Sequence, residues 1–443
     1  MDGDNDRERQ SKASASADPG HLAADVRHVT THTPQAEGRI RELPVSEAQQ
    51  GLWEAQKLAP DVPVTIAQYL DLPGAIDSAA VAEAVRMTGC EVEAARTRII
   101  ERGGRPVQVI DSDLPLDVEM LDFRSAPEPR TAAEVWMKEH AAECVDVVND
   151  RLLYNALLRV GDEHYIWYCR SHHIIFDGYS AMKVVQRIAK RYGALLDRTD
   201  LPPLGALGLA GVGAYTDSYR RSEQYAIDRE YWSRRLDPLP SVHSLAADRT
   251  APAHASSIRA GSALPRTTIE AVGALCARRG LRPATVISAA MALYLAVQTG
   301  DQDVVLGLPV AARPSRALRR SGGVLSNVVP LRASVGSQTT VGGLLGAMEA
   351  ELTAAIEHQC YRHEDMMRDA GAATGRRGFL GPLINIMMFH DGIDFGSVPG
   401  TMHLLSTGPV EDLSVNVYPA AGGRATVVDF EANPNLYADD DRR

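Results

Sequence analysis

The chain has 443 residues, of which 45% are hydrophobic and 23% charged, as expected for a soluble globular protein large enough for two domains. Its formal net charge of −11 argues against nucleic acid and anionic membranes as main partners. The five cysteines are scattered and form no CxxC pair, so we expect reduced thiols in a cytoplasmic protein. The longest apolar stretch, residues 285–297, is too short to span a bilayer and predicts a buried helix.

The first part of the chain predicts a leader followed by mixed helices and strands. Residues 1–38 are polar, lack a signal core and are expected to be disordered. Order is expected from about residue 43, where Ser46 and Gln49 form a capping-box pattern ahead of an apolar helix face. Further on, two apolar strands at residues 152–160 and 165–175 flank a short turn, which predicts a hairpin.

The second of these strands runs into His172 and His173, which are followed by three apolar residues and then Asp177 and Gly178. Because side chains alternate along a strand, the two imidazoles are expected to point to opposite faces. A histidine can accept a proton from an amine or an alcohol near neutral pH. We expect Gly178 to make a tight turn, and Asp177 to form a structural ion pair or to orient an imidazole.

Other interpretations of this motif stay open on the residues alone. Both histidines can be packed strand-end residues bonded to backbone, which is the commoner situation for an isolated His-His pair. A zinc site is disfavoured, because opposite-facing neighbours make poor joint ligands and no Cys or His cluster lies nearby, so we expect no metal. The complete pattern of two histidines, three apolar residues and Asp-Gly favours a catalytic role.

The second part of the chain repeats the α/β style. A stretch rich in Leu, Gly and Pro at residues 196–213 predicts a linker between two halves. Helices are predicted at residues 267–279 and 284–299, and a strand at residues 303–310 leads towards Arg313.

Residues 172–178 resemble the HHxxxDG signature of condensation domains from nonribosomal peptide synthetases, which is shared by chloramphenicol acetyltransferase and related carrier- or CoA-dependent acyltransferases. Other condensation-domain motifs are resembled by residues 46–53, 303–313, 323–332 with Asn327, and 381–389. Arg96 and Thr97 match the family's second motif, although its usual His is missing here and its Leu is Ala95.

The resemblance runs from about residue 40 to the end of the chain. Residues 406–414 and 432–437 resemble the condensation domain that opens the serine-activating synthetase of enterobactin assembly. This likeness implies an aryl or short acyl donor, a siderophore-like product and an L-configured acceptor.

The family resemblance implies an α/β fold in which two chloramphenicol acetyltransferase-like sandwich subdomains form a V-shaped pseudodimer with a tunnel across the cleft. The N-terminal subdomain would cover residues 39–198 and carry the HHxxxDG motif, and the C-terminal subdomain residues 199–443. The chain would bind no cofactor, because its substrates arrive on the phosphopantetheine arms of donor and acceptor carrier proteins. An adenylation domain of the same synthetase is a further candidate partner, and a monomer without nucleic acid or membrane partners is expected.

The implied reaction is the formation of an amide bond between a carrier-bound acyl thioester and a carrier-bound aminoacyl group, in nonribosomal peptide or siderophore biosynthesis. His173 would face the tunnel and act either as general base or as a positioner of the amine. His172 and Asp177 would shape the loop, and the backbone N–H of Gly178 would lie close to the thioester.

Three further residues are expected to support the site. Arg313 would pair with Asp177 across the two halves, Asn327 would hold loops of the cleft, and Arg96 belongs to a mainly structural motif. A solvated loop cation is the alternative for Arg313, and a turn residue is the alternative for Asn327.

Rival functions differ at the motif. An epimerisation domain typically has Ser-Trp after the Asp in place of Gly-Tyr-Ser, a heterocyclisation domain replaces the first His with Asp, and an inactive recruitment domain loses the second His or the Gly. A freestanding carrier- or CoA-dependent acyltransferase that forms an ester stays open. A non-catalytic carrier-binding scaffold is the alternative of another class, and the intact motif weighs against it.

Overall fold

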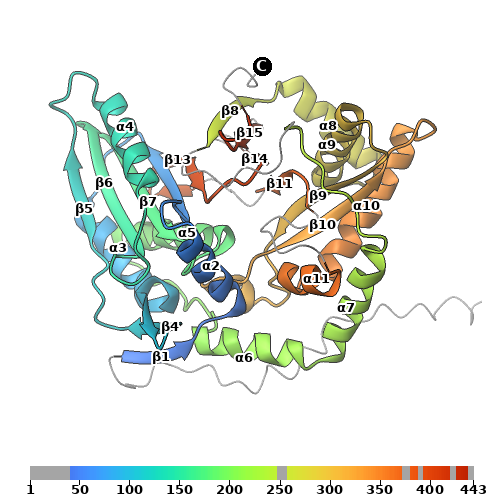
Figure 1. Ribbon diagram of the computed structural model, residues 1–443. Coiled ribbons are helices and arrows are strands. Elements are labelled where there is room, and N and C mark those ends of the chain that lie inside the picture. Colours follow the sequence, from blue (N-terminus) through green and yellow to red (C-terminus); the bar gives the residue numbers. More distant parts are fainter. Residues whose placement is uncertain (1–39, 247–256, 372–379, 388–392, 420–425, 438–443) are drawn as a thin grey trace, which may run out of the picture. The chain divides into compact units, whose positions relative to one another are not determined.

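The computed structural model describes residues 40–246, 257–371, 380–387, 393–419 and 426–437, and the expected leader at residues 1–38 lies outside them. These residues build two six-stranded sheets and one three-stranded sheet, with helices packed against the large sheets (Figure 1). The α/β class predicted from the sequence is therefore confirmed.

The first large sheet carries the His-His motif on an inner strand. In their order across the sheet, its strands are β12 (Ile393–Phe395), β13 (Val398–Thr407), β2 (Thr65–Leu72), β7 (His164–His172), β6 (Leu153–Gly161) and β5 (Val118–Asp122). Strands β6 and β7 form the predicted antiparallel hairpin. Strands β12 and β13 come from the later part of the chain, and β13 pairs antiparallel with β2.

Both faces of the first sheet are covered by helices. The face that includes Trp167 packs against α3 (Ser78–Glu91) and α5 (Gly178–Leu196). The face that includes Tyr168 packs against α4 (Pro129–Ala142). Consecutive residues of β7 thus lie in different layers, as the period of two in a strand requires.

The second large sheet has its own helical layer. In order across the sheet, its strands are β10 (Asn327–Ser334), β9 (Asp303–Val310), β11 (Leu383–Ile386), β14 (Leu413–Pro419), β15 (Thr426–Ala432) and β8 (Ile258–Ala263). Helices α9 (Pro283–Thr299) and α10 (Val341–Glu357) pack against β9 and β10, and α8 (Arg266–Arg279) packs against α9. Buried apolar residues of α9, α10 and the sheet form the largest hydrophobic cluster among the described residues.

The three-stranded sheet lies in the first half of the chain. Its strands are β1 (Ile40–Pro44), β4 (Arg105–Asp111) and β3 (Thr97–Arg102), in that order. Helix α2 (Glu47–Leu58) follows β1 and begins with the predicted capping box of Ser46 and Gln49. Two short 3₁₀ helices are η2 (Glu93–Arg96) and η3 (Leu318–Arg320).

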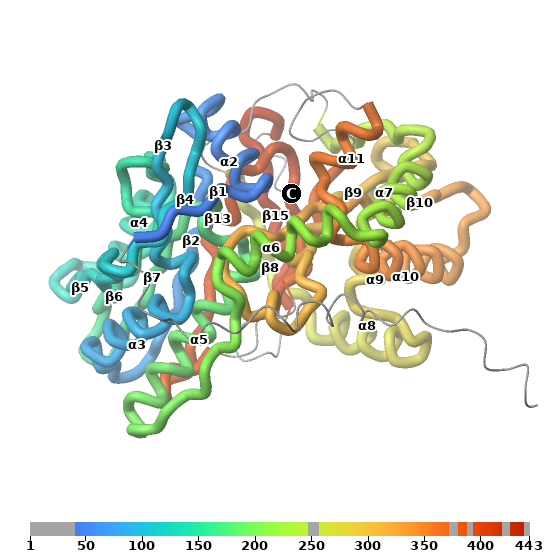
Figure 2. Tube along the Cα trace, turned by 90° about the horizontal axis from the view of Figure 1, so that it is seen from below, coloured from blue at the N-terminus to red at the C-terminus, as the bar shows by residue number. Residues whose placement is uncertain are grey.

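Helix α6 (Leu209–Arg220) begins inside the stretch predicted as a linker, residues 196–213, whose last five residues are therefore helical. It connects the first half to α7 (Glu223–Arg235) (Figures 1 and 2). At the end of α6, Arg220 pairs with Glu47 of α2 and also with Asp365 of α11 (His363–Asp369), at 2.9 Å from the latter.

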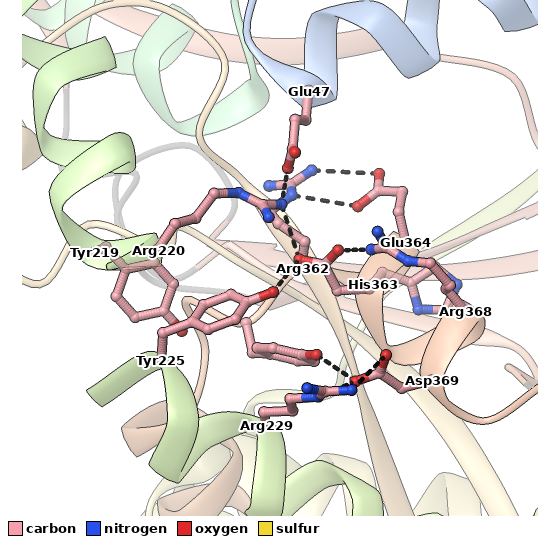
Figure 3. A network of polar contacts seen from close by, with 12 residues as sticks. Glu47, Tyr219, Arg220, Tyr225, Arg229, Arg362, His363, Glu364, Arg368 and Asp369 are labelled. Atoms are coloured by element: carbon pink, nitrogen blue, oxygen red, sulfur yellow. Dashed lines mark hydrogen bonds and ion pairs between the residues drawn. The ribbon is translucent and has the colours of Figure 1, made fainter. Parts of the chain in front are cut away.

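One guanidinium thus contacts a helix from each half of the chain. Figure 3 shows Arg220 reaching Glu47, with the ring of Tyr225 close by. The carboxylate of Asp365 is almost completely buried, and Arg368 pairs with it as well.

Within the described ranges, no single helix has both the length and the apolar character needed to cross a membrane. Helices α8 and α9 meet these two criteria only as a pair, and they are bent by 109° relative to each other. The stretch predicted to be a buried helix lies in α9, where seven residues are buried.

Candidate active site

The HHxxxDG motif forms a mostly buried loop between β7, which ends at His172, and α5, which begins at Gly178. The three apolar residues Ile174, Ile175 and Phe176 are at most 1% exposed. They belong to a hydrophobic cluster with residues of α2 and η2. The three apolar positions of the motif therefore anchor the loop in the core.

The ring of His172 is fixed by hydrogen bonds on both nitrogens. Its Nδ1 accepts from the backbone N–H of Ile174 at 3.0 Å, so Nε2 carries the proton and donates to Oε1 of Gln56 at 3.2 Å. The amide nitrogen of Gln56 donates to two backbone carbonyls, which keeps its oxygen available for His172. Burial lowers the pKa of His172 to about 3, and the neighbouring His173 adds to this effect. His172 therefore shapes the loop as a neutral residue.

The ring of His173 contacts a different element, in agreement with the predicted opposite directions of the two imidazoles. Its Nε2 donates to the backbone carbonyl of Thr407, at the end of β13, at 3.0 Å. A neutral imidazole has one N–H, so Nδ1 holds the lone pair. Burial lowers the pKa of His173, whereas the Thr407 carbonyl and the Asp177 carboxylate oppose this effect. At neutral pH the ring is uncharged and can accept a proton.

Gly408 lies directly against this imidazole. A Cβ atom on Gly408 would be 2.7 Å from Nε2 of His173, and the φ angle of Gly408 is +104°. Both the backbone conformation and the lack of space require glycine here. This contact could not be predicted from the sequence, because Thr407, the residue before Gly408, lies 234 residues beyond His173.

Asp177 holds the loop in place through hydrogen bonds to both of its carboxylate oxygens. It caps α5 by accepting from the backbone N–H of Ser180 at 2.8 Å. Its other oxygen accepts from the guanidinium of Arg313 at 2.7 Å and from the backbone N–H groups of Leu325 and Ser326 at 2.9 and 2.8 Å.

The predicted ion pair between Asp177 and Arg313 is present in the structure. The side chains of Asp177 and Arg313 are 4% and 0% exposed. Burial alone would raise the pKa of Asp177, but Arg313 and the backbone donors outweigh it and lower the pKa to about 2. Asp177 therefore secures the loop to the second half of the chain as a carboxylate.

Gly178 is the first residue of α5 and is exposed. The tight turn predicted at Gly178 is wrong, because the turn lies at residues 173–175 and Gly178 is already helical. A Cβ atom on Gly178 would meet no other group within 4 Å. The space beside the motif is therefore open at this residue.

Asn327 lies at the start of β10, directly after two residues that bind Asp177. Its amide oxygen accepts from the backbone N–H of His363, and its amide nitrogen donates to the carbonyls of Gln359 and Tyr361 at 3.0 and 2.7 Å. Asn327 thus connects the segment that binds Asp177 to the loop between α10 and α11.

Arg96 lies apart from this arrangement. Its guanidinium donates to the carbonyl of Ser112 at 2.6 Å and to the sulfur of Cys90 at 2.7 Å. Its two neighbours Ala94 and Ala95 pack in the cluster that also holds the motif loop. Within the described ranges, no group of three or more His, Cys, Asp or Glu residues is arranged to hold a metal ion.

A small apolar cavity of about 20 Å³ lies behind the motif loop, between β6, β7, α3 and α5. Ser171, Phe176 and Ala181 line its side nearest the motif. Asn155 and Cys169 face each other on paired strands at the same cavity. The buried Oδ1 of Asn155 has no hydrogen-bond partner. The volume is enough for about one water molecule.

Comparison with known proteins agrees with this geometry. Residues 39–439 match the family described as Condensation domain. The chain is 35% identical to a dimodular nonribosomal peptide synthase of Bacillus subtilis (strain 168), over 89% of this chain and 17% of that protein. It is 29% identical to enterobactin synthase component F of Escherichia coli (strain K12), over 90% of this chain and 31% of that protein. The chain thus spans less than a third of the length of these two relatives.

Solved structures give the same result. The starter condensation domain of rhizomide synthetase, a variant in complex with C8-CoA, aligns with a TM-score of 0.84 and 32% identity, over 90% of this chain and 91% of that chain. The predicted family and the predicted likeness to the enterobactin synthase are therefore confirmed. The chain belongs to the condensation domains, the amide-bond-forming acyltransferases of nonribosomal peptide synthetases.

Proposed function

We propose that this chain joins an acyl group from a donor carrier protein to the amine of an aminoacyl group on an acceptor carrier protein. The amine nitrogen attacks the thioester carbonyl, the C–N bond forms, the C–S bond breaks, and the proton released by the amine ends on the leaving thiolate. The neutral imidazole of His173, held by the Thr407 carbonyl in the loop that leads to the exposed Gly178, is the observation that carries this proposal.

His173 would accept a hydrogen bond from the amine and then its proton. Because burial lowers the pKa of His173, the ring is a weak base and its main contribution would be to aim the amine. The exposed N-terminus of α5 at Gly178 would place a backbone N–H near the oxygen of the thioester, where negative charge develops. The ion pair of Asp177 and Arg313 would keep the His173 imidazole and the Gly178 N–H in fixed positions relative to each other.

The substrates would arrive on the phosphopantetheine arms of two carrier proteins, with an adenylation domain of the same synthetase as a further partner. The chain would need no cofactor of its own. Residues 39–198 and 199–443 would form the two subdomains around the reaction site, with β12 and β13 contributed by the second to the sheet of the first.

The donor would be an acyl or aryl group that starts a product, not a growing peptide. The likeness to a starter condensation domain that binds C8-CoA and to enterobactin synthase component F supports this choice. Carriers loaded with aryl, short acyl, fatty acyl and peptidyl groups, and an acyl-CoA, would be offered with one aminoacyl carrier. A clear preference for the peptidyl donor would refute a starter role.

The central experiment compares the wild-type protein with His173→Ala, using loaded carriers and mass spectrometry of the product. We expect the variant to lose at least about 100-fold in rate, as for removal of a proton acceptor. His164→Ala is the matched control, because His164 lies at the other end of β7 and pairs with Asp71. Undiminished amide formation by His173→Ala, with an intact circular dichroism spectrum, would refute the assignment. Binding of carriers without any product from the wild-type protein would indicate a scaffold instead.

A further inference from the structure

Thr407 makes two polar contacts, one through its carbonyl and one through its hydroxyl, with residues from different halves of the molecule. Its carbonyl accepts from Nε2 of His173, in the turn that follows β7, at 3.0 Å. Its hydroxyl donates to Oε2 of Glu431, on β15 of the second sheet, at 2.6 Å. One residue therefore connects the imidazole to a carboxylate in the other half of the molecule.

Glu431 is held firmly. Its side chain is 1% exposed, and the amide of Asn416 donates at 3.1 Å to the same oxygen that binds Thr407. Arg259, on β8, forms an ion pair with the other oxygen. Arg259 also donates to the carbonyl of Leu404 at 2.7 Å. The end of β13 is thus attached to the second sheet at two points, Leu404 and Thr407.

The simplest explanation of these contacts is structural: they join the two sheets. Buried ion pairs contribute little net stability when compared with apolar packing, so stability alone does not account for a carboxylate here. The position of Thr407 also matters to His173 itself, because Gly408 leaves no spare room beside the ring. A displacement of Thr407 away from the ring would weaken the hydrogen bond, and a displacement towards the ring would push it away.

The Thr407 carbonyl also selects a tautomer. A carbonyl oxygen only accepts hydrogen bonds, so it favours the form of His173 with the proton on Nε2 and the lone pair on Nδ1. This is the role that a carboxylate or carbonyl partner commonly has towards a catalytic histidine.

We propose that Glu431, acting through the hydroxyl of Thr407, is a positioning residue that holds the His173 imidazole in place and in its Nε2–H tautomer. The consequence for catalysis rests on the proposed function of His173 in amide formation. The consequence for the tautomer does not depend on it.

The kinetic test compares four variants of the full chain with loaded donor and acceptor carriers. Thr407→Val removes the hydroxyl but keeps the shape and the carbonyl, and we expect kcat to fall about tenfold with an unchanged KM for the acceptor carrier. Thr407→Ser, which restores the hydroxyl, should stay within about twofold of the wild type. Glu431→Gln should lower kcat at least as much as Thr407→Val, and the double variant should be no worse than the poorer single variant.

Asp429→Asn is the matched control. Asp429 lies on the same strand as Glu431 and also pairs with Arg259, at 3.2 Å, whereas the hydroxyl of Thr407 donates to Glu431. We expect this variant to change kcat by less than about twofold, even if it melts at a lower temperature. A fall in kcat equal to that of Glu431→Gln would overturn the proposal, because it would show a general effect of weakening the sheet.

The second readout is NMR of protein labelled with ¹⁵N in its histidine rings, with the His173 signals identified by their loss in His173→Ala. The wild type should show a protonated Nε2 and an unprotonated Nδ1, and Thr407→Val should show a mixture of tautomers. A pure Nε2–H form in Thr407→Val together with undiminished kcat would overturn the proposal. If the wild type forms no amide, the NMR result still decides the positioning role. If Glu431→Gln does not fold, the comparison of Thr407→Val with Thr407→Ser decides it.

Discussion

Removing the carboxylate of Asp177 is expected to destabilise the protein strongly. In Asp177→Ala, the guanidinium of Arg313 keeps its position at 0% exposure but loses its ion-pair partner. Breaking one side of a buried ion pair costs about 3–5 kcal/mol, because the other charge is left uncompensated. The backbone N–H groups of Leu325 and Ser326 also lose their acceptor.

Thermal melting can measure this loss. Unfolding entropy is about 2.1 cal/mol/K per residue, so a cooperative unit of about 400 residues has about 0.8 kcal/mol/K, and the midpoint should fall by about 4–6 °C. The double variant Asp177→Ala with Arg313→Met should recover part of this loss, because the unpaired charge is gone. Glu83→Gln is the control, since the pair of Glu83 with Arg86 is exposed and its loss should leave the midpoint nearly unchanged. An unchanged midpoint for Asp177→Ala together with lost activity would refute this reasoning and would assign Asp177 to the chemistry.

Asp177 also predicts how the stability of the protein depends on pH. The pKa of Asp177 in the folded protein is about 2, below its ordinary value of 3.8. The carboxylate therefore contributes its full stabilisation above pH 4, and this contribution is lost as the pH falls towards 2. Acid unfolding of the wild type should be steeper in this range than that of the double variant. Identical acid-unfolding curves for the two proteins would contradict this assignment.

Three further substitutions test separate parts of the structure. Gly408→Ala should abolish activity and lower the melting temperature, because its Cβ would lie 2.7 Å from the ring of His173; normal turnover would contradict this contact. Gly178→Val should keep the melting temperature within about 2 °C, because its side chain enters open space, and should slow amide formation; full activity would show that no substrate passes there. Arg220→Met should lower the melting temperature, because the buried Asp365 loses one partner, and an unchanged midpoint would show that Arg368 suffices.

Local signals in the sequence predicted local structure well. The helices expected at residues 267–279 and 284–299 are α8 and α9, each beginning one residue earlier. Gly280 and Gly300 end them in the left-handed conformation, as glycine commonly does at a helix C-terminus. The hairpin of β6 and β7 was predictable for the same reason, because its strands are neighbours in sequence.

The contacts that complete the site could not be predicted in this way. The partner of His173 lies on β13, whose place beside β2 depends on the assembly of a whole sheet. Nothing in the sequence around Thr407 or Glu431 indicates that these side chains meet. The error at Gly178 has a simpler cause: glycine after Asp177 suggests a turn, but Asp177 is an N-cap, so the next residue begins a helix.

Residues from both halves of the molecule form the site around the motif. The first half supplies the imidazole of His173, and the second half supplies the charged groups that fix its surroundings, Arg313 for Asp177 and Glu431 for Thr407. Arg313 and Glu431 are both buried charges, so each of them depends on its hydrogen-bonded partner in the folded protein. Loss of the imidazole should therefore remove activity and leave stability intact, whereas loss of either support should reduce both. This difference would distinguish the proposed role of His173 in the reaction from the positioning roles proposed for Asp177, Arg313, Thr407 and Glu431.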